Sequence, residues 1–152
     1  MHILFIGYGK TSQRVAKQLF EQGHQITTIS QSPKTDVWAH HLIQDVHQLN
    51  LSQIPLVDAV YILLSPNIGT IDAYQQTYVD SIRPIVQALK NHPIQKVIVV
   101  SSTRVYGENN GECIDDETAP NPSDEQGKLL LEMEQLWQQA YPEHCIIIRP
   151  TG

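Results

Sequence analysis

The chain has 152 residues, 41% of them hydrophobic, and a formal net charge of -6. This length and composition fit one domain with an ordinary hydrophobic core. The acidic balance argues against a nucleic-acid partner, because the sequence has no basic stripe that could neutralise phosphates. No charged leader or long apolar segment indicates export or membrane insertion, and neither Cys113 nor Cys145 belongs to a CxxC pair. We therefore expect a cytoplasmic protein with free thiols and no membrane partner.

The first predicted element is a strand over residues 1–7, MHILFIG, which opens onto a glycine loop and a helix. Gly7 and Gly9 match the first two glycines of a GxGxxG motif, and Ser12 stands at the third. In that motif the first glycine permits a tight turn, and the second lets the backbone approach a pyrophosphate at the helix amino terminus. The alternative is a glycine turn in an α/β protein that binds no nucleotide. The expected dinucleotide-binding residues of this loop are Gly7, Gly9, Lys10, Thr11 and Ser12.

A helix with apolar residues Val15, Leu19 and Phe20 should follow the loop, and Gly23 should end it. The second predicted strand, QITTIS, then ends where an acidic residue would bind the ribose hydroxyls of NAD. The chain has Ser30, Gln31 and Ser32 there, with Lys34 just beyond. These residues favour the 2'-phosphate of NADP over NAD. The Ser32-Pro33 pair can equally begin a turn, so the choice between the two cofactors stays open.

Strands and helices continue to alternate, which predicts a doubly wound parallel sheet of the Rossmann type with the strand order 3-2-1-4-5-6. Residues 41–44 predict the third strand, 59–65 the fourth, 97–100 the fifth, and a run beginning at Cys145 the sixth. A helix is expected over 72–90, with Pro84 bending or splitting it. His40, His41 and His47 lack the spacing of metal ligands, so we expect no metal site and histidines that lie mostly on the surface.

Two hydroxyl residues, Ser101 and Ser102, follow the fifth strand at the edge where open α/β sheets bind ligands. The segment SSTRVYG at 101–107 resembles the extended short-chain dehydrogenase/reductase family, the NAD(P)-dependent sugar-nucleotide epimerases and dehydratases. The resemblance implies that Ser102 and Lys128 are two of three catalytic residues, that Lys128 also holds the nicotinamide ribose, and that Asp45 lies beside the adenine. Ser65, at the end of the fourth strand, is expected near the cofactor as well.

The family's third catalytic residue, a tyrosine four residues before the lysine, is absent. Asp124 stands at that position, and its unperturbed pKa of about 4, against about 10 for tyrosine, makes it a poor proton carrier. Asp124 is instead expected to form an ion pair with Lys128, in a helix that begins with a capping box from Ser123 to Gln126. Tyr106 is a weaker candidate for the missing phenol, and its alternative role is packing.

Two functions remain open from the sequence. One is an atypical NAD(P)-dependent epimerase or reductase that acts on a sugar nucleotide or another small carbonyl or hydroxyl substrate. Dehydration is disfavoured, because Thr103 and Arg104 stand where the family's dehydratases carry an acidic pair. The other is a non-catalytic dinucleotide-binding redox sensor or regulatory protein. The resemblance covers residues 1–152 but only the cofactor-binding half of the family's proteins, so we expect this chain to be the amino-terminal part of a longer protein. Because members of the family often form dimers, the resemblance also allows a homodimer.

Overall fold

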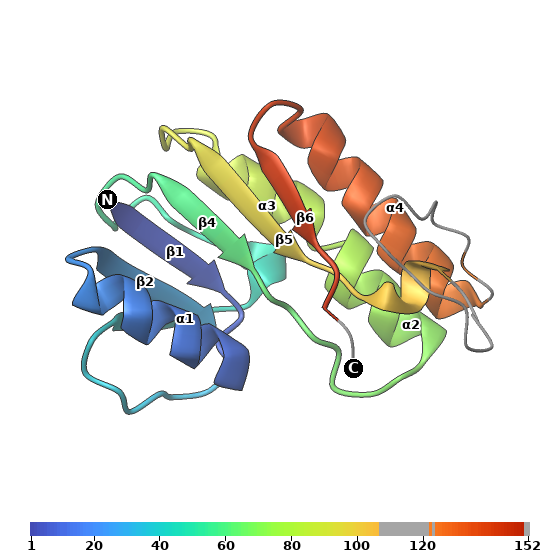
Figure 1. Cartoon of the computed structure of the whole chain (residues 1–152), viewed down its shortest axis with the longest axis horizontal. Coiled ribbons are helices and arrows are strands. Elements are labelled where there is room, and N and C mark those ends of the chain that lie inside the picture. The colour runs from blue at the N-terminus through green and yellow to red at the C-terminus, as the bar shows by residue number, and fades with distance from the viewer. Residues whose placement is uncertain (107–121, 123, 151–152) are drawn as a thin grey trace.

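The computed structural model describes residues 1–106, 122 and 124–150. Six parallel strands form one sheet in the order β3-β2-β1-β4-β5-β6, which confirms the predicted Rossmann topology. Figure 1 shows β2, β1, β4, β5 and β6 side by side. The strands are short runs rich in β-branched residues, as is typical of parallel sheets that are covered on both faces. They are β1 (His2–Ile6), β2 (Gln25–Ser30), β3 (His40–Ile43), β4 (Ala59–Ile62), β5 (Lys96–Val100) and β6 (Cys145–Ile148).

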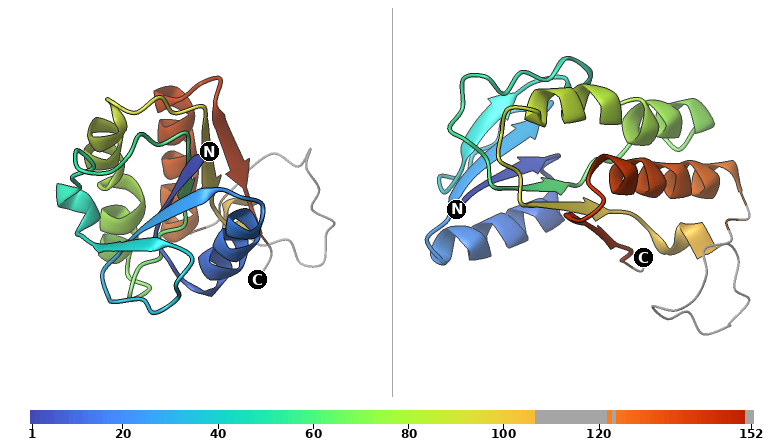
Figure 2. Two further views of the ribbon diagram at one scale, coloured as in Figure 1. Left: turned by 90° about the vertical axis from the view of Figure 1, so that its left-hand side faces the viewer. Right: turned by 90° about the horizontal axis from the view of Figure 1, so that it is seen from above.

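The helices lie in two layers, one on each face of the sheet (Figure 2). Helix α1 (Lys10–Glu21) covers one face. The other face carries α2 (Ile71–Tyr74), the π-helix η2 (Gln75–Val79), α3 (Ile82–Leu89) and α4 (Glu125–Ala140). Two short 3-10 turns complete the described elements, η1 (Val46–Gln48) and η3 (Thr103–Tyr106).

Strand β1 lies between two hydrophobic cores, one on each face of the sheet, and contributes side chains to both. All five of its residues are buried. Leu4 and Ile6 belong to the larger core under α3 and α4, whereas Ile3 and Phe5 belong to the smaller core under α1. Successive side chains of a strand point to opposite faces, so one apolar strand can supply both cores. This central position fixes the start of the glycine loop that follows β1.

The end of α1 confirms the role predicted for Gly23. Gly23 has a φ of +94°, its N–H donates to the carbonyl of Phe20, and the next N–H donates to the carbonyl of Leu19. These two bonds form a Schellman cap, which favours glycine. Phe20, one of the apolar residues of this helix, does not pack against the sheet, and its side chain is 48% exposed. Only a narrow stripe of α1 faces the sheet, and Phe20 lies one residue, or about 100°, beyond Leu19 on the helix.

The helix predicted over 72–90 is split, as expected from Pro84. The N–H of Asp80 donates to the carbonyl of Gln75, five residues back, at 2.9 Å. Pro84 has no N–H with which to reach the carbonyl of Asp80, so the hydrogen-bond ladder cannot run through unbroken. The result is a π-helix followed by a new helix, α3, with Pro84 in its first turn.

Most of the histidines are exposed or partly exposed, as predicted, and His2 is the exception: it is 5% exposed and contacts the Thr27 hydroxyl at 2.6 Å. His92 accepts from the N–H of Val57 at 3.1 Å and also contacts the carbonyl of Leu51. A histidine can bridge backbone groups in this way because its two ring nitrogens can act as one donor and one acceptor.

Cys145 is a half-buried free thiol in β6, whereas Cys113 lies outside the described residues. Within residues 1–106, 122 and 124–150, no helix combines the length and the apolar character needed to cross a membrane.

Candidate functional site

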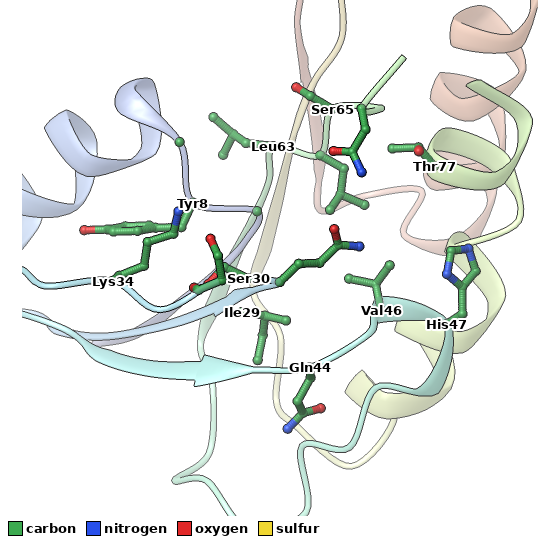
Figure 3. Close-up of a pocket in the computed structure, with 16 residues that line it drawn as sticks. Tyr8, Ile29, Ser30, Lys34, Gln44, Val46, His47, Leu63, Ser65 and Thr77 are labelled. Atoms are coloured by element: carbon green, nitrogen blue, oxygen red, sulfur yellow. The ribbon is translucent and has the colours of Figure 1, made fainter. Parts of the chain in front are cut away.

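A pocket of about 360 Å³ opens at the carboxyl edge of β1, β2 and β4 (Figure 3). This is the point where the chain order of the sheet reverses, since β1 leads to a helix on one face and β4 to helices on the other. Open α/β sheets bind ligands at such a switch point. The lining residues come from the glycine loop, the ends of three strands, η1 and the π-helix: Gly7, Tyr8, Gly9, Ile29, Ser30, Gln31, Ser32, Lys34, Gln44, Val46, His47, Leu63, Leu64, Ser65, Asn67 and Thr77.

The two glycines of the loop meet different constraints. Gly7 has a φ of +93°, and a Cβ there would lie 2.2 Å from the carbonyl oxygen of Leu63. The close approach of the loop to the end of β4 therefore requires glycine. A Cβ on Gly9 would meet nothing within 4 Å, so the backbone of Gly9 faces open space at the pocket.

The amino terminus of α1 also faces this region. Gly9 is the N-cap residue and supplies no side-chain acceptor to the first turn. Backbone N–H groups there are open to an anion, which the helix dipole also favours. Ser12, at the third motif position, is buried and donates from Oγ to the carbonyl of Gly7 at 3.0 Å, so it holds the loop from below. Lys10 and Thr11 are exposed and do not line the pocket.

Tyr8, between the two glycines, anchors the glycine loop to the segment after β2. Its hydroxyl donates to Asp36 at 2.8 Å and accepts from the indole N–H of Trp38 at 3.1 Å. His41 of β3 bonds to the same Asp36 carboxylate. Burial, assisted by the bond to Asp36, raises the pKa of Tyr8, so the phenol stays protonated as a donor. Sequence reasoning missed Tyr8, although an aromatic residue between two motif glycines was the available signal.

The residues predicted at the end of β2 are brought together in the pocket wall. Ser30, Gln31, Ser32 and Lys34 all line it, and Figure 3 shows Lys34 beside Tyr8. The hydroxyl of Ser30 donates to the carbonyl of Ser32 at 2.9 Å. This segment bends at residues 31–32 and forms part of the pocket wall. Among the described residues that line the pocket, none is an aspartate or a glutamate.

The opposite side of the pocket is formed by the turn after β3. Asp45 caps η1, and its Oδ1 accepts from the backbone N–H of His47 at 2.9 Å. This backbone bond, followed by the bond to the His47 ring, lowers the pKa of Asp45. Asp45 itself does not line the pocket, whereas its neighbours Val46 and His47 do. The sequence missed these two residues and Thr77 of the π-helix, because only the fold brings η1 and η2 to one cavity.

The carboxyl edge of β5 carries a second polar cluster, centred on Arg104. The guanidinium donates to Oδ2 of Asp124 from Nε at 2.9 Å and from Nη2 at 2.7 Å, and to the hydroxyl of Tyr74 at 3.1 Å. The backbone N–H of Arg104 donates to Oγ of Ser102 at 3.1 Å. The hydrogen bond from Arg104 lowers the pKa of Asp124. Asp124 is therefore ionised near neutral pH and cannot serve there as a proton donor.

Two predictions about the start of α4 are wrong. Asp124 caps the helix, accepting from the N–H of Gly127 at 2.7 Å, whereas Ser123 was the predicted cap and lies outside the described residues. The ion pair predicted between Asp124 and Lys128 does not form, because the planar fork of Arg104 engages the carboxylate with two donors. The ammonium group of Lys128 lies 3.3 Å from Glu125, and its side chain is 59% exposed.

Tyr106 is held by packing and hydrogen bonding. Its hydroxyl accepts from Nη1 of Arg149 at 2.8 Å, and Arg149 also pairs with the buried Glu134 at 2.5 Å. Ser65, predicted near the cofactor, also lines the pocket, whereas the predicted catalytic residues Ser102, Tyr106 and Lys128 do not. Among the described residues, no three His, Cys, Asp or Glu side chains are grouped so that they could hold a metal ion.

No protein-family model and no curated protein matches the sequence. Solved structures do match the fold. A UDP-glucuronic acid 4-epimerase from Bacillus cereus, in complex with NAD, has a TM-score of 0.82 at 20% identity, over 99% of this chain and 56% of its own. A UDP-galactose 4-epimerase has a TM-score of 0.81 at 16% identity, over 98% of this chain and 55% of its own.

A protein from Methylobacillus flagellatus, provisionally named as an NAD-dependent epimerase/dehydratase, has a TM-score of 0.76 at 28% identity, over 97% of this chain and 53% of its own. The chain thus spans about half the length of the solved structures it matches. The structural neighbours are members of the epimerase/dehydratase family that the SSTRVYG segment indicated. This chain has the Rossmann α/β fold that makes up about half of each of those proteins.

Proposed function

We propose that the chain is the dinucleotide-binding part of an NAD(P)-dependent epimerase- or reductase-like protein that acts on a sugar nucleotide or another small carbonyl or hydroxyl substrate. The observation that carries this proposal is the pocket at the β1–β4 switch point. Its volume of about 360 Å³ lies in the range of small-molecule sites. The open backbone at Gly9 and the amino terminus of α1 suit a diphosphate, and Ile29, Val46 and Leu63 offer apolar walls to a flat base.

The same pocket favours NADP over NAD. Lys34, Ser30 and Ser32 all line the pocket at the end of β2, where a lysine and two hydroxyls would bind a 2'-phosphate, and no carboxylate among the described lining residues would repel it. The cofactor would supply hydride chemistry. The chain's own residues would bind the diphosphate at Gly9, hold the adenosine ribose near Ser30, and offer the hydroxyls of Ser65 and Ser102 toward the nicotinamide end.

Binding can be tested by titrating the chain with NADPH and NADH and following the nicotinamide fluorescence. We expect saturable binding, and a loss of at least about tenfold in affinity for Gly9→Val, because a side chain at this position blocks the approach of the diphosphate. The melting temperature should be unchanged, since a Cβ on Gly9 meets nothing within 4 Å.

Gly69→Val is the matched control. Its Cβ also meets nothing within 4 Å, but Gly69 does not line the pocket, so both cofactors should bind it as they bind the wild type. Unchanged affinity in Gly9→Val would contradict the placement of the diphosphate.

A second candidate function is a non-catalytic dinucleotide sensor. One observation favours it: the family's tyrosine position is held by Asp124, which is ionised and paired with Arg104. An enzyme should oxidise bound NADPH with some member of a panel of carbonyl compounds, at a rate that falls in Ser102→Ala. A sensor should bind NADPH tightly and leave it unoxidised by every compound of the panel.

A further inference from the structure

His47 joins two parts of the pocket wall that lie 29 residues apart in sequence. It belongs to η1 and lies beside Thr77 of the π-helix (Figure 3). Its Nδ1 lies 3.0 Å from Oδ1 of Asp45, and its Nε2 lies 2.8 Å from the carbonyl oxygen of Gln76. Both partners are acceptors, so both bonds exist together only when both ring nitrogens carry a proton. A neutral imidazole has one N–H and can make only one of them.

The π-helix makes this contact available. In an α-helix the N–H of Asp80 would donate to the carbonyl of Gln76, four residues back. Here it donates to Gln75, five residues back, and His47 takes the carbonyl of Gln76. Single turns of π-helix occur frequently at functional sites. In this chain the π-helix leaves the Gln76 carbonyl as an acceptor for His47, next to Thr77, which lines the pocket.

We propose that His47, in its charged form, is a positioning residue of the nucleotide pocket. Its two hydrogen bonds, to Asp45 and to the Gln76 carbonyl, form a clasp that holds η1 against the π-helix and fixes the distance between these two walls. Because the clasp needs both ring protons, affinity for a dinucleotide decreases when the imidazole loses one of them. The inference rests on the proposed dinucleotide binding at the same pocket. It adds a residue and a pH dependence that dinucleotide binding by itself does not require.

The charges around His47 support a protonated ring. Partial burial acts to lower the pKa of His47, but the Gln76 carbonyl and the Asp45 carboxylate outweigh it, and the pKa is raised overall. Asp80, in the turn after the π-helix, is the second carboxylate that acts on the ring. The cation Lys34 lies on the opposite side of the pocket (Figure 3). A raised pKa means that the clasp is complete below the ordinary histidine pKa of about 6.5 and is lost as the pH rises through the higher folded value.

NADH is the appropriate probe, because it lacks the 2'-phosphate that would itself titrate near neutral pH. We expect the Kd of the wild type to increase about threefold between about pH 6 and about pH 8.5, the size of effect typical of one partly exposed charged contact. In His47→Gln, which is neutral at every pH, the Kd for NADH should be independent of pH and as high as that of the wild type at the upper end of this range. Asp45→Asn should move the midpoint of the wild-type profile to lower pH, because it removes a charge that stabilises the imidazolium.

His40→Gln is the control, since His40 is an exposed residue of β3 that does not line the pocket, and it should keep the wild-type profile. A pH-independent Kd in the wild type, or an unchanged profile in His47→Gln, overturns the inference and leaves the proposed function standing. If the wild type shows no saturable NADH binding at any pH, the proposed function fails as well. The pH midpoint of NADH binding in Asp45→Asn tests the inference a second time, and this measurement does not depend on the stability of His47→Gln.

Discussion

Lys34 is the residue on which the choice of cofactor should depend most directly. It lines the pocket beside the hydroxyls at the end of β2, and no acidic residue of the described lining opposes it. We expect Lys34→Ala to weaken NADPH binding about tenfold, because one charged hydrogen bond to a phosphate contributes on the order of 1.5 to 3 kcal/mol. NADH binding should change less than about twofold. Titration of both cofactors by fluorescence measures the ratio.

Lys90→Ala is the control for this substitution, because Lys90 is an exposed residue at the end of α3 that does not line the pocket. It should leave both affinities unchanged. A parallel loss of NADPH and NADH affinity in Lys34→Ala would instead place Lys34 on a group that the two cofactors share, such as the diphosphate.

Gly7 and Gly9 show what the sequence could and could not predict for single residues. The motif correctly indicated a glycine loop, and both residues line the pocket. It could not separate their constraints, because the oxygen that would collide with a side chain on Gly7 belongs to Leu63, far away in the sequence. Tyr8 was missed for the same reason, since its partner Asp36 lies 28 residues further along the chain.

At the scale of elements, local signals predicted more. Short apolar runs between turn signals predicted all six strands, most of them rich in β-branched residues, and right-handed crossovers gave the strand order. Pro84 correctly predicted a broken helix. The π-helix before it could not be predicted, because it depends on which carbonyl each backbone N–H reaches, and the periodicity of apolar side chains does not show this. At the start of α4, a favourable spacing suggested the partner Lys128, whereas Arg104 of η3 reaches Asp124 with two donors.

Asp124 connects η3 to the start of α4, so substitutions of Asp124 test how much this contact stabilises the fold. Asp124→Ala should lower the free energy of unfolding by about 1 to 2 kcal/mol, because it removes both the helix cap and the partly exposed ion pair with Arg104. Asp124→Asn should cost less, since asparagine caps helices as well as aspartate does and only the ion pair is lost. Urea denaturation of the two variants measures the difference. NADH binding should stay within about twofold of the wild type in both, because Asp124 does not line the pocket.

The pH dependence of this contact has a defined sign. The pKa of Asp124 is lowered in the folded chain. The stability it contributes is therefore present above its unfolded pKa of about 3.9 and is lost as the pH falls through the lower folded value. A loss of NADH affinity in Asp124→Asn would contradict the purely structural role of Asp124 and would show that it also affects dinucleotide binding.

At the scale of the whole molecule, contacts between residues distant in sequence hold the polar segments in place, and these were the least predictable. The loop after β2 is fixed to the glycine loop by Tyr8, Asp36 and His41, and His92 ties the loop before β4 to the end of α3. Each contact needs two segments that only the folded sheet brings together. The sequence supplied the residues, and their pairing follows from the topology.

The end of β6 is tied to α4 and η3 by the buried pair of Arg149 and Glu134, with the hydroxyl of Tyr106 as a third member. Glu134 is 1% exposed, so Arg149→Ala would leave a buried carboxylate without its partner. We expect this variant to lose about 3 to 5 kcal/mol in the free energy of unfolding, measured by urea denaturation. The double variant Arg149→Met with Glu134→Leu should recover most of the loss, because apolar residues of similar volume replace buried ion pairs at little cost.

Lys128→Ala, which breaks an exposed pair on the same helix, should cost less than about 0.5 kcal/mol. If Arg149→Ala costs no more than Lys128→Ala, the pair does not hold β6 to α4, and the apolar contacts of Cys145 and Ile147 with the larger core must do so instead.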